Sequence, residues 1–322
     1  MSAYHVPGTI AQLLTLAAGV LALGVIATRL RPAAGRALAW ALVIVTSIAA
    51  ERLTAAEPAG VRMVAISAGL LIAFKAVVTV EAQAEGMPPL PAGLWLLFAG
   101  LWVGMRPEAF RTVGGPAKSG VGRLIGRALG HMLAGFGLLW LARELRSSDA
   151  DSSRVMASPV LLAGVCLMFH FGLLTLVAAT WRLTGVPAEE LHRRPLAARS
   201  LTEFWGRRWN LPFAEMTARA VYRPLRRRIG PAAALFASFA LSGVLHEAAI
   251  SVPVRAGYGG PLAYFLLHGG LVLLERRLAA AGCGPEAWGV AGRVWTAAWL
   301  VGPLPLLFHK PFLEGVVWPL VG

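Results

Sequence analysis

An ionisable pair, His246 and Glu247, stands inside the apolar stretch PAAALFASFALSGVLHEAAISVP at residues 231–253. An ionisable side chain at membrane depth is expensive to bury and usually serves a function. Histidine has an ordinary pKa of about 6.5, so a neutral imidazole is suited to take a proton from a hydroxyl group. Glu247 points about 100° away from His246 on a helix and therefore lies on another face. The stretch predicts a helix over 231–252 that carries a proton acceptor.

The composition predicts a membrane protein around this site. Hydrophobic residues make up 57% of the 322 positions and charged residues only 14%, with a mean hydropathy of +0.65. These values exclude an ordinary soluble domain. Apolar runs close to the length needed to cross a bilayer lie at 9–28, 37–50, 61–80, 90–105, 121–142, 158–181, 231–252, 259–275 and 291–309.

These runs predict an all-α, polytopic integral membrane helical bundle of eight to nine spans in a single domain, residues 1–322. Residues 1–90 hold the N-terminal spans. The run at 37–50 is short for a span, which also permits an interfacial or re-entrant helix.

The net charge of +14 is concentrated in loops, above all in residues 182–230, which hold eleven Arg against four Glu. The loops at 106–123 and 276–293 are also basic, and the positive-inside rule then predicts that these three loops face the cytoplasm. The first loop, with Arg29, Arg31 and Arg36, does not fit this assignment. Basic loops beside membrane helices are explained by the lipid bilayer or an anionic ligand, so nucleic acid is not an expected partner.

The 182–230 loop also carries hydrophobic residues, including Trp205 and Trp209, at a spacing that suits an interfacial helix. Pro212 and Pro224 are expected to divide this segment into short helical pieces. The loop is therefore predicted to lie at the membrane surface directly before the His246 helix.

Three motifs in this region resemble a known family. They are FWGRRWN at 204–210, VYRP at 221–224 and SGVLHE at 242–247, in that order along the chain. The chain resembles the membrane-bound O-acyltransferases, and within them the wax synthase branch, over about residues 95–310. The first 90 residues contribute only generic spans to this resemblance.

The resemblance implies an enzyme that moves an acyl group from a coenzyme A thioester to a hydroxyl, in an internal reaction chamber of the helical bundle. The buried histidine of the family corresponds to His246 and its partner asparagine to Asn210, so these two residues are the predicted catalytic pair. His246 is expected to deprotonate the acceptor alcohol. The amide of Asn210 is expected to bind the thioester oxygen or to orient the alcohol.

Five further residues are predicted to contact substrate, each beside a simpler structural interpretation. Arg207 and Arg208 suit the phosphates of coenzyme A, although lipid headgroups would satisfy them equally. Trp209 precedes Asn210 and is favoured over Trp205 as a wall of the site. Glu247 is assigned to substrate binding, with local structure or an ion pair as the alternative.

The sequence leaves the acceptor open. A long-chain alcohol with a long-chain acyl-CoA is favoured; O-acetylation of a terpenoid, sterol or other secondary-metabolite alcohol and acylation of diacylglycerol are alternatives. From a different class, a proton-coupled transporter would use Lys75, His170, His246 and Glu247 as a proton or ion path. The roles of the intramembrane Lys75, His170 and His268 are not predicted.

No metal site and no tightly bound cofactor are expected, with acyl-CoA serving as co-substrate. The two cysteines, Cys166 and Cys283, have no metal-binding spacing. The high Ala, Arg, Gly and Leu content favours a gene rich in G and C and hence a multi-pass protein of the bacterial inner membrane. Oligomeric state is not predicted.

Overall fold

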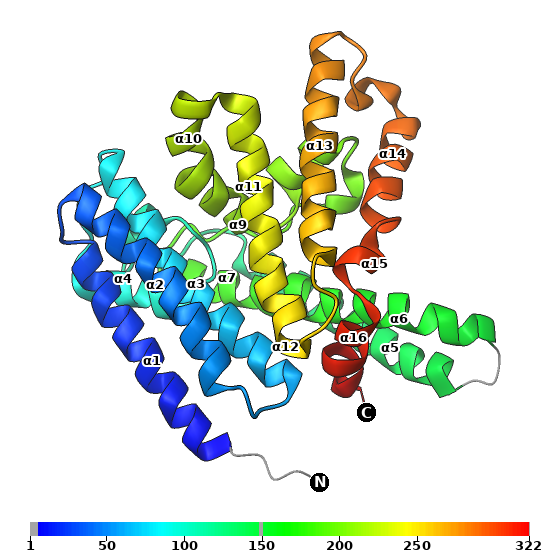
Figure 1. Ribbon diagram of the computed structural model, residues 1–322, viewed down its shortest axis with the longest axis horizontal. Coiled ribbons are helices and arrows are strands. Elements are labelled where there is room, and N and C mark those ends of the chain that lie inside the picture. Colours follow the sequence, from blue (N-terminus) through cyan, green and yellow to red (C-terminus); the bar gives the residue numbers. More distant parts are fainter. Residues whose placement is uncertain (1–5, 148–150, 322) are drawn as a thin grey trace. The chain divides into compact units, whose positions relative to one another are not determined.

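The chain folds into helices joined by turns, and no strand occurs in residues 6–147 and 151–321, which the computed structural model describes (Figure 1). The predicted all-α, polytopic membrane bundle is therefore confirmed. The α-helices are α1 Val6–Ala27, α2 Pro32–Leu53, α3 Ala59–Ala84, α4 Ala92–Leu101, α5 Val121–Ser147, α6 Asp151–Cys166, α7 Leu174–Leu183, α8 Leu201–Glu203, α9 Leu211–Thr217, α10 Arg223–Ile229, α11 Pro231–His246, α12 Val252–Val254, α13 Gly260–Ala280, α14 Val290–Val301, α15 Leu304–Leu307 and α16 Lys310–Phe312.

Wider π-helical turns interrupt several of these helices. They lie at Leu167–Leu173, Phe204–Arg208, Ala218–Tyr222, Glu247–Ser251 and Leu313–Val317. Short 3₁₀ turns lie at Pro107–Thr112, Pro195–Ala197, Pro285–Trp288 and Trp318–Leu320. π-helical turns are rare and often mark functional sites, and two of them lie beside the predicted catalytic residues Asn210 and His246.

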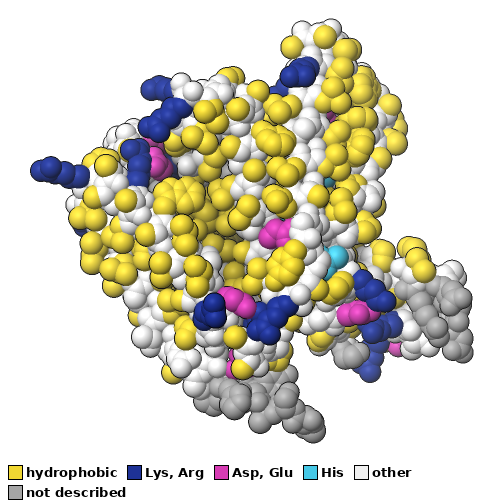
Figure 2. All heavy atoms as spheres, in the orientation of Figure 1, with side chains coloured by type: hydrophobic (Ala, Val, Ile, Leu, Met, Phe, Trp, Pro, Cys, Tyr) yellow, Lys and Arg dark blue, Asp and Glu magenta, His cyan; other side chains and the backbone are white. Residues whose placement is uncertain are grey.

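Seven helical segments in the described part of the chain are long and apolar enough to cross a membrane. They are Gly8–Ala27, Pro32–Leu53, Ala59–Ala84, Val121–Ser147, Val155–Leu183, Pro231–Val254 and Val290–Leu307. The helix α13 adds 21 residues, but its last turns carry Glu275, Arg276 and Arg277. On the face drawn in Figure 2, the side chains over α1 to α3 and α11 are mainly hydrophobic, as contact with lipid requires.

Two of the apolar runs form helices of unexpected length. The run at 37–50 belongs to the 22-residue helix α2, because Pro32 starts the helix early and the helix continues past Arg52 to Leu53. The run at 90–105 forms only the ten-residue helix α4, since the backbone becomes extended at Trp102. The first is thus a full-length span, and the second is too short to be one.

The chain divides into two compact units. The first consists of Met1–Glu108 and Arg194–Phe312, and the second of Ala109–Arg193 and Leu313–Gly322. Both predicted catalytic residues belong to the first unit. Within it, α1, α2 and α3 pack side by side, and α11 packs along α13 (Figure 1).

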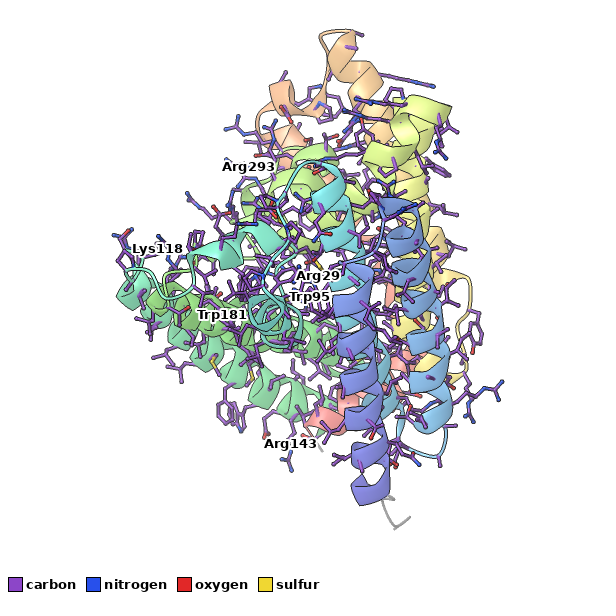
Figure 3. The ribbon with its side chains drawn as sticks, turned by 90° about the vertical axis from the view of Figure 1, so that its left-hand side faces the viewer. Arg29, Trp95, Lys118, Arg143, Trp181 and Arg293 are labelled. Carbon is purple, nitrogen blue, oxygen red and sulfur yellow. The ribbon has the colours of Figure 1, made fainter. Side chains whose placement is uncertain are left out.

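In the first unit, the short helix α4 is held by a buried tryptophan. Trp95 is 1% exposed and its Nε1–H donates a 3.0 Å hydrogen bond to Thr79 Oγ1 on α3. A Cβ atom on Gly24 of α1 would lie 2.3 Å from the Trp95 ring, so glycine at this position lets α1 approach it (Figure 3). Beside it, Arg29 Nη2 donates to the carbonyl of Leu90, 2.6 Å away, just before α4 begins.

In the second unit, two glycines allow a close helix crossing. A Cβ on Gly135 of α5 would lie 2.9 Å from the carbonyl oxygen of Gly164 on α6, and a Cβ on Gly164 would lie 3.1 Å from that of Gly135. Small residues at such crossings let membrane helices pack backbone against backbone. The α5–α6 pair therefore depends on the absence of side chains at both positions.

Replacing Gly135 by Val should destabilise the protein by roughly 1–3 kcal/mol, because the new side chain must push α6 away. Gly137→Val is the matched control on the same helix, since a Cβ there meets nothing within 4 Å. The measurement is the thermal unfolding midpoint in detergent, followed by circular dichroism. Equal midpoints for the two variants would contradict a close α5–α6 crossing.

Candidate active site

The histidine predicted to act as base lies where a regular helix changes its winding. His246 is the last residue of α11, and the π-helical turn Glu247–Ser251 follows directly. The short α12 then ends the segment with Val254. The His246 side chain is partly buried, and its backbone lies at the boundary between the two kinds of helix.

A hydrogen bond within its own helix orients the His246 ring. Nδ1 lies 2.7 Å from the carbonyl oxygen of Ser242, one turn earlier. A carbonyl oxygen can only accept, so Nδ1 must carry the hydrogen in this bond. In the neutral imidazole the lone pair then lies on Nε2. The geometry thus leaves Nε2 as the atom that can take a proton from a substrate.

Aromatic rings from two other helices flank the His246 ring. The Phe265 ring on α13 lies 4.1 Å from it between centroids, inclined by 37°. The Phe213 ring on α9 lies 5.6 Å away in an edge-on arrangement. These apolar neighbours limit the water around Nε2 and favour a lipophilic substrate there.

Asn210, the second predicted catalytic residue, has an unusual backbone conformation. Its φ of 41° places it in the left-handed region, which few residues other than glycine adopt, although asparagine tolerates it. This conformation joins the π-helical turn Phe204–Arg208 to α9. The carbonyl of Asn210 accepts from the N–H groups of Phe213 and Ala214, at 2.9 and 3.1 Å.

The structure connects the two predicted catalytic residues through Phe213. This residue comes three positions after Asn210 in the first turn of α9, and its ring packs against His246. The turn at Asn210 therefore sets the direction of α9 and, with it, the position of the Phe213 ring against His246. The helix that follows the FWGRRWN motif, α9, thus packs against α11, which carries the SGVLHE motif.

Trp205 has closer links to His246 than Trp209. The Trp205 ring lies 5.6 Å from Phe265, the same ring that packs on His246, and its Nε1 is buried without a hydrogen-bond partner in the described residues. Trp209 instead stacks on Phe204 at 5.6 Å. Sequence reasoning favoured Trp209 as a wall of the site, whereas these contacts favour Trp205.

The two arginines of the FWGRRWN motif differ in their surroundings. Arg208 donates from Nε to Glu203 Oε1 over 2.8 Å, and from Nη1 to the carbonyl of Arg194 over 3.2 Å. Burial by itself would raise the pKa of Glu203, but hydrogen bonds from the Arg199 N–H and Arg208 outweigh it and hold the pKa below its usual value. Arg207 is exposed. Their predicted contact with phosphate stays a prediction.

Other arginines of the same loop are engaged in ion pairs. Arg223 Nη1 lies 2.7 Å from Glu85, and Arg219 Nη2 lies 3.0 Å from Glu108. Sequence reasoning missed both glutamates, because they are far away in the chain. These pairs join the loop after α3 and the segment before α5 to the π-helical turn Ala218–Tyr222 and to α10.

Glu247 has a structural contact. Its Oε1 accepts from the backbone N–H of Gly259 at 2.8 Å and from that of Leu262 at 3.0 Å. These groups lie at the N-terminus of α13, where a carboxylate is favoured by unpaired N–H groups and by the helix dipole. The contacts agree with the alternative that Glu247 fixes local structure, and its assignment to substrate binding stays a prediction.

The other intramembrane polar residues have partners close by. Lys75 is fully buried, donates to the carbonyl of Gly104, and places Nζ 4.1 Å from the centre of the Phe98 ring. His268 Nδ1 lies 2.8 Å from the carbonyl of Tyr264. His170 belongs to the second unit, where its ring lies 5.3 Å from that of His192. In the described residues, no group of three or more His, Cys, Asp or Glu could hold a metal ion.

Comparison with known proteins finds a family match over the region of this site. Residues 188–267 match the family model "Membrane bound O-acyl transferase family". "Probable long-chain-alcohol O-fatty-acyltransferase 7" of Arabidopsis thaliana is 37% identical over 102 residues, which cover 29% of this chain and 30% of the relative.

Two further relatives have similar coverage. "Long-chain-alcohol O-fatty-acyltransferase" of Simmondsia chinensis is 31% identical over 132 residues, 36% of this chain and 38% of the relative. "Acyl-CoA--sterol O-acyltransferase 1" of Arabidopsis thaliana is 32% identical over 108 residues, 30% and 31% of the two chains. The aligned region thus spans less than half the length of these curated relatives.

The family match contains both Asn210 and His246, together with Trp205 and Phe265 from the aromatic surroundings. Over residues 188–267 the chain therefore matches the membrane-bound O-acyltransferases, and its resemblance to their wax synthase branch is confirmed.

Proposed function

We propose that the protein transfers an acyl group from acyl-CoA to the hydroxyl of a lipophilic alcohol. The observation that carries this proposal is the environment of the His246 ring. Its Nδ1 donates a hydrogen bond to the Ser242 carbonyl, and two phenylalanine rings flank it. A hydroxyl is a weak nucleophile near neutral pH, and a neutral imidazole with a free Nε2 is a suitable acceptor for its proton. The family match over the same residues supports this reaction class.

In the proposed mechanism, both substrates bind together and no covalent acyl-enzyme forms. His246 Nε2 takes the hydroxyl proton while the alcohol oxygen attacks the thioester carbonyl. The tetrahedral intermediate collapses, the C–S bond breaks, and the coenzyme A thiolate recovers the proton from the imidazolium. The amide of Asn210 donates to the thioester oxygen as negative charge develops on it.

A long-chain alcohol with a long-chain acyl-CoA, giving a wax ester, is the favoured substrate pair. Support comes from the relatives of Simmondsia chinensis and Arabidopsis thaliana that are named for long-chain alcohols. The relative named for sterol acylation supports a sterol as second candidate acceptor. O-acetylation of a secondary-metabolite alcohol and acylation of diacylglycerol are the remaining proposals, ranked after these two.

The transporter alternative has less support. Lys75 donates to a backbone carbonyl and lies over the Phe98 ring, and Glu247 accepts from two backbone N–H groups, so both residues have local partners. The protein is a multi-pass integral membrane protein. Its proposed placement in a bacterial inner membrane rests on composition alone, since the three relatives above are plant proteins and lend it no support.

Purified protein should form ester from palmitoyl-CoA and a fatty alcohol, because the apolar surroundings of His246 favour long chains. The test supplies palmitoyl-CoA or acetyl-CoA with pooled fatty alcohols, sterols and diacylglycerol, and identifies esters by mass spectrometry. Acetyl esters alone would replace the wax-ester assignment by the acetylation alternative. Folded protein that makes no ester with any pair would contradict the proposal.

Replacing His246 by Ala should lower turnover by at least roughly 10²-fold, because the general base is lost. His131→Ala is the control, since His131 is also a partly buried histidine within a membrane span but belongs to the second unit. The measurement is the initial rate of ester formation by protein that elutes as a single folded species in detergent. Comparable rates for the two variants would remove His246 from the mechanism.

Replacing Asn210 by Gly should separate the amide from the backbone conformation. Glycine adopts the φ of 41° without strain, so Asn210→Gly should remain as stable as wild type but lose at least roughly 10²-fold in turnover with the amide. Asn210→Ala should lose the same activity and also about 1 kcal/mol or more of stability. Turnover by Asn210→Gly close to that of wild type would show that only the backbone conformation matters.

A further inference from the structure

A buried arginine from the N-terminal spans contacts the end of the helical segment that carries His246. Arg62 on α3 is 4% exposed. Its Nη1 donates to the carbonyl of Pro253 over 2.5 Å, and its Nη2 donates to that of Val252 over 3.2 Å. The same guanidinium pairs with Glu51 near the end of α2. Residue 62 lies outside the family match at 188–267.

These carbonyls belong to the last residues of a helix, and that of Val252 also accepts from the backbone N–H of Arg255 over 3.2 Å. The last four carbonyl groups of a helix have no partner within the helix, and a positive charge is favoured at that end. Leaving them unpaired in an apolar environment is costly. The buried guanidinium donates to both carbonyls, as a second donor in the case of Val252, while the carboxylate of Glu51 compensates its charge. The Arg62 contacts therefore fix the end of α12 relative to α2 and α3.

The fixed end of α12 lies one π-helical turn after His246. The π-helical turn Glu247–Ser251 occupies all the residues between His246 and Val252. A π-helical turn contains one residue more than an α-helical turn. If the π-helical turn moved along the helix, the residues that it passed would rotate by about 100° around the helix axis. His246 is the residue directly before it, so a shift of the turn would redirect Nε2.

Both ends of this π-helical turn have an electrostatic anchor. At the start, Glu247 Oε1 accepts from Gly259 and Leu262 on the adjacent α13 segment. After its end, Arg62 binds the carbonyls of Val252 and Pro253. Anchoring at two ends prevents the turn from moving along the helix, and the His246 ring then keeps one direction.

We infer that Arg62 is a positioning residue for His246, oriented by Glu51 and acting through the end of α12. It touches no substrate. This inference rests on the proposed acyl transfer for its kinetic readout. The inference gives the N-terminal spans a role in catalysis, whereas the sequence motifs assign no role to these spans.

The test compares Arg62→Met, Arg62→Lys and Glu51→Gln in the full chain. Arg62→Met should lower kcat for ester formation by roughly 10- to 100-fold, as expected for a small displacement of a catalytic group, with KM for acyl-CoA within about 2-fold. Arg62→Lys keeps the charge and should recover part of this loss; Glu51→Gln should produce a smaller decrease. Arg255→Met is the matched control, because Arg255 follows α12 and donates to the Ala55 carbonyl from an exposed position.

A second readout does not require turnover. The rate at which diethyl pyrocarbonate modifies His246, measured by peptide mass spectrometry, should change in the Arg62 variants and stay at the wild-type value in Arg255→Met. If wild type forms no ester, the proposed function fails while this rate still tests the position of His246.

Wild-type kcat and wild-type His246 modification in folded Arg62→Met would overturn the inference. So would equal losses of kcat in Arg62→Met and Arg255→Met, which would indicate a general loosening of this end of the protein. If Arg62→Met does not fold, Arg62→Lys and Glu51→Gln are judged by the same two readouts, and wild-type values in both would overturn it.

Discussion

The hydrogen bond from His246 Nδ1 to the Ser242 carbonyl determines which nitrogen of the ring can act as base. It joins residues one helical turn apart, so its geometry depends on α11 remaining regular up to His246. The next residues form the wider π-helical turn Glu247–Ser251. The direction of the ring therefore depends on α11 before it and on the contacts that hold the π-helical turn after it. Several other long-range contacts of the first unit involve buried polar side chains.

Those contacts follow from the cost of polar groups in an apolar interior. A buried side chain that carries donors must find acceptors, and in a membrane bundle the accessible acceptors are helix-end and loop carbonyls. Lys75 uses the carbonyl of Gly104, and Arg62 uses those of Val252 and Pro253. Each such bond fixes one chain segment against another. Polar residues that are unfavourable for membrane insertion thus become the connections that give an apolar bundle one defined arrangement.

Sequence alone predicted the helical class and the segment that contains the site, because both depend on local signals. Apolar length marks the spans, and the spacing of motifs around Asn210 and His246 marks the site region. The extent of α2 was not predicted, since Arg36 and Arg52 interrupt its hydropathy without ending the helix. The shortness of α4 also escaped prediction, because only the backbone at Trp102 shows where the helix ends.

Contacts between distant residues were the main omission. Phe265 lies on a helix without a recognised motif, yet its ring is 4.1 Å from His246. Residue type indicates that a buried charge needs a partner, and only the packing of the helices identifies that partner.

The apolar surroundings of His246 also bear on the competition between transfer and hydrolysis. Water is a nucleophile much like an alcohol, so a base that activates a hydroxyl would also activate water if water reached it. The rings of Phe213 and Phe265 occupy two sides of the imidazole. A lipophilic alcohol gains favourable contacts with such walls, whereas a water molecule leaves its own hydrogen bonds unmade there. In the proposed acyl transfer, the same rings that favour an apolar acceptor would therefore protect the thioester from hydrolysis.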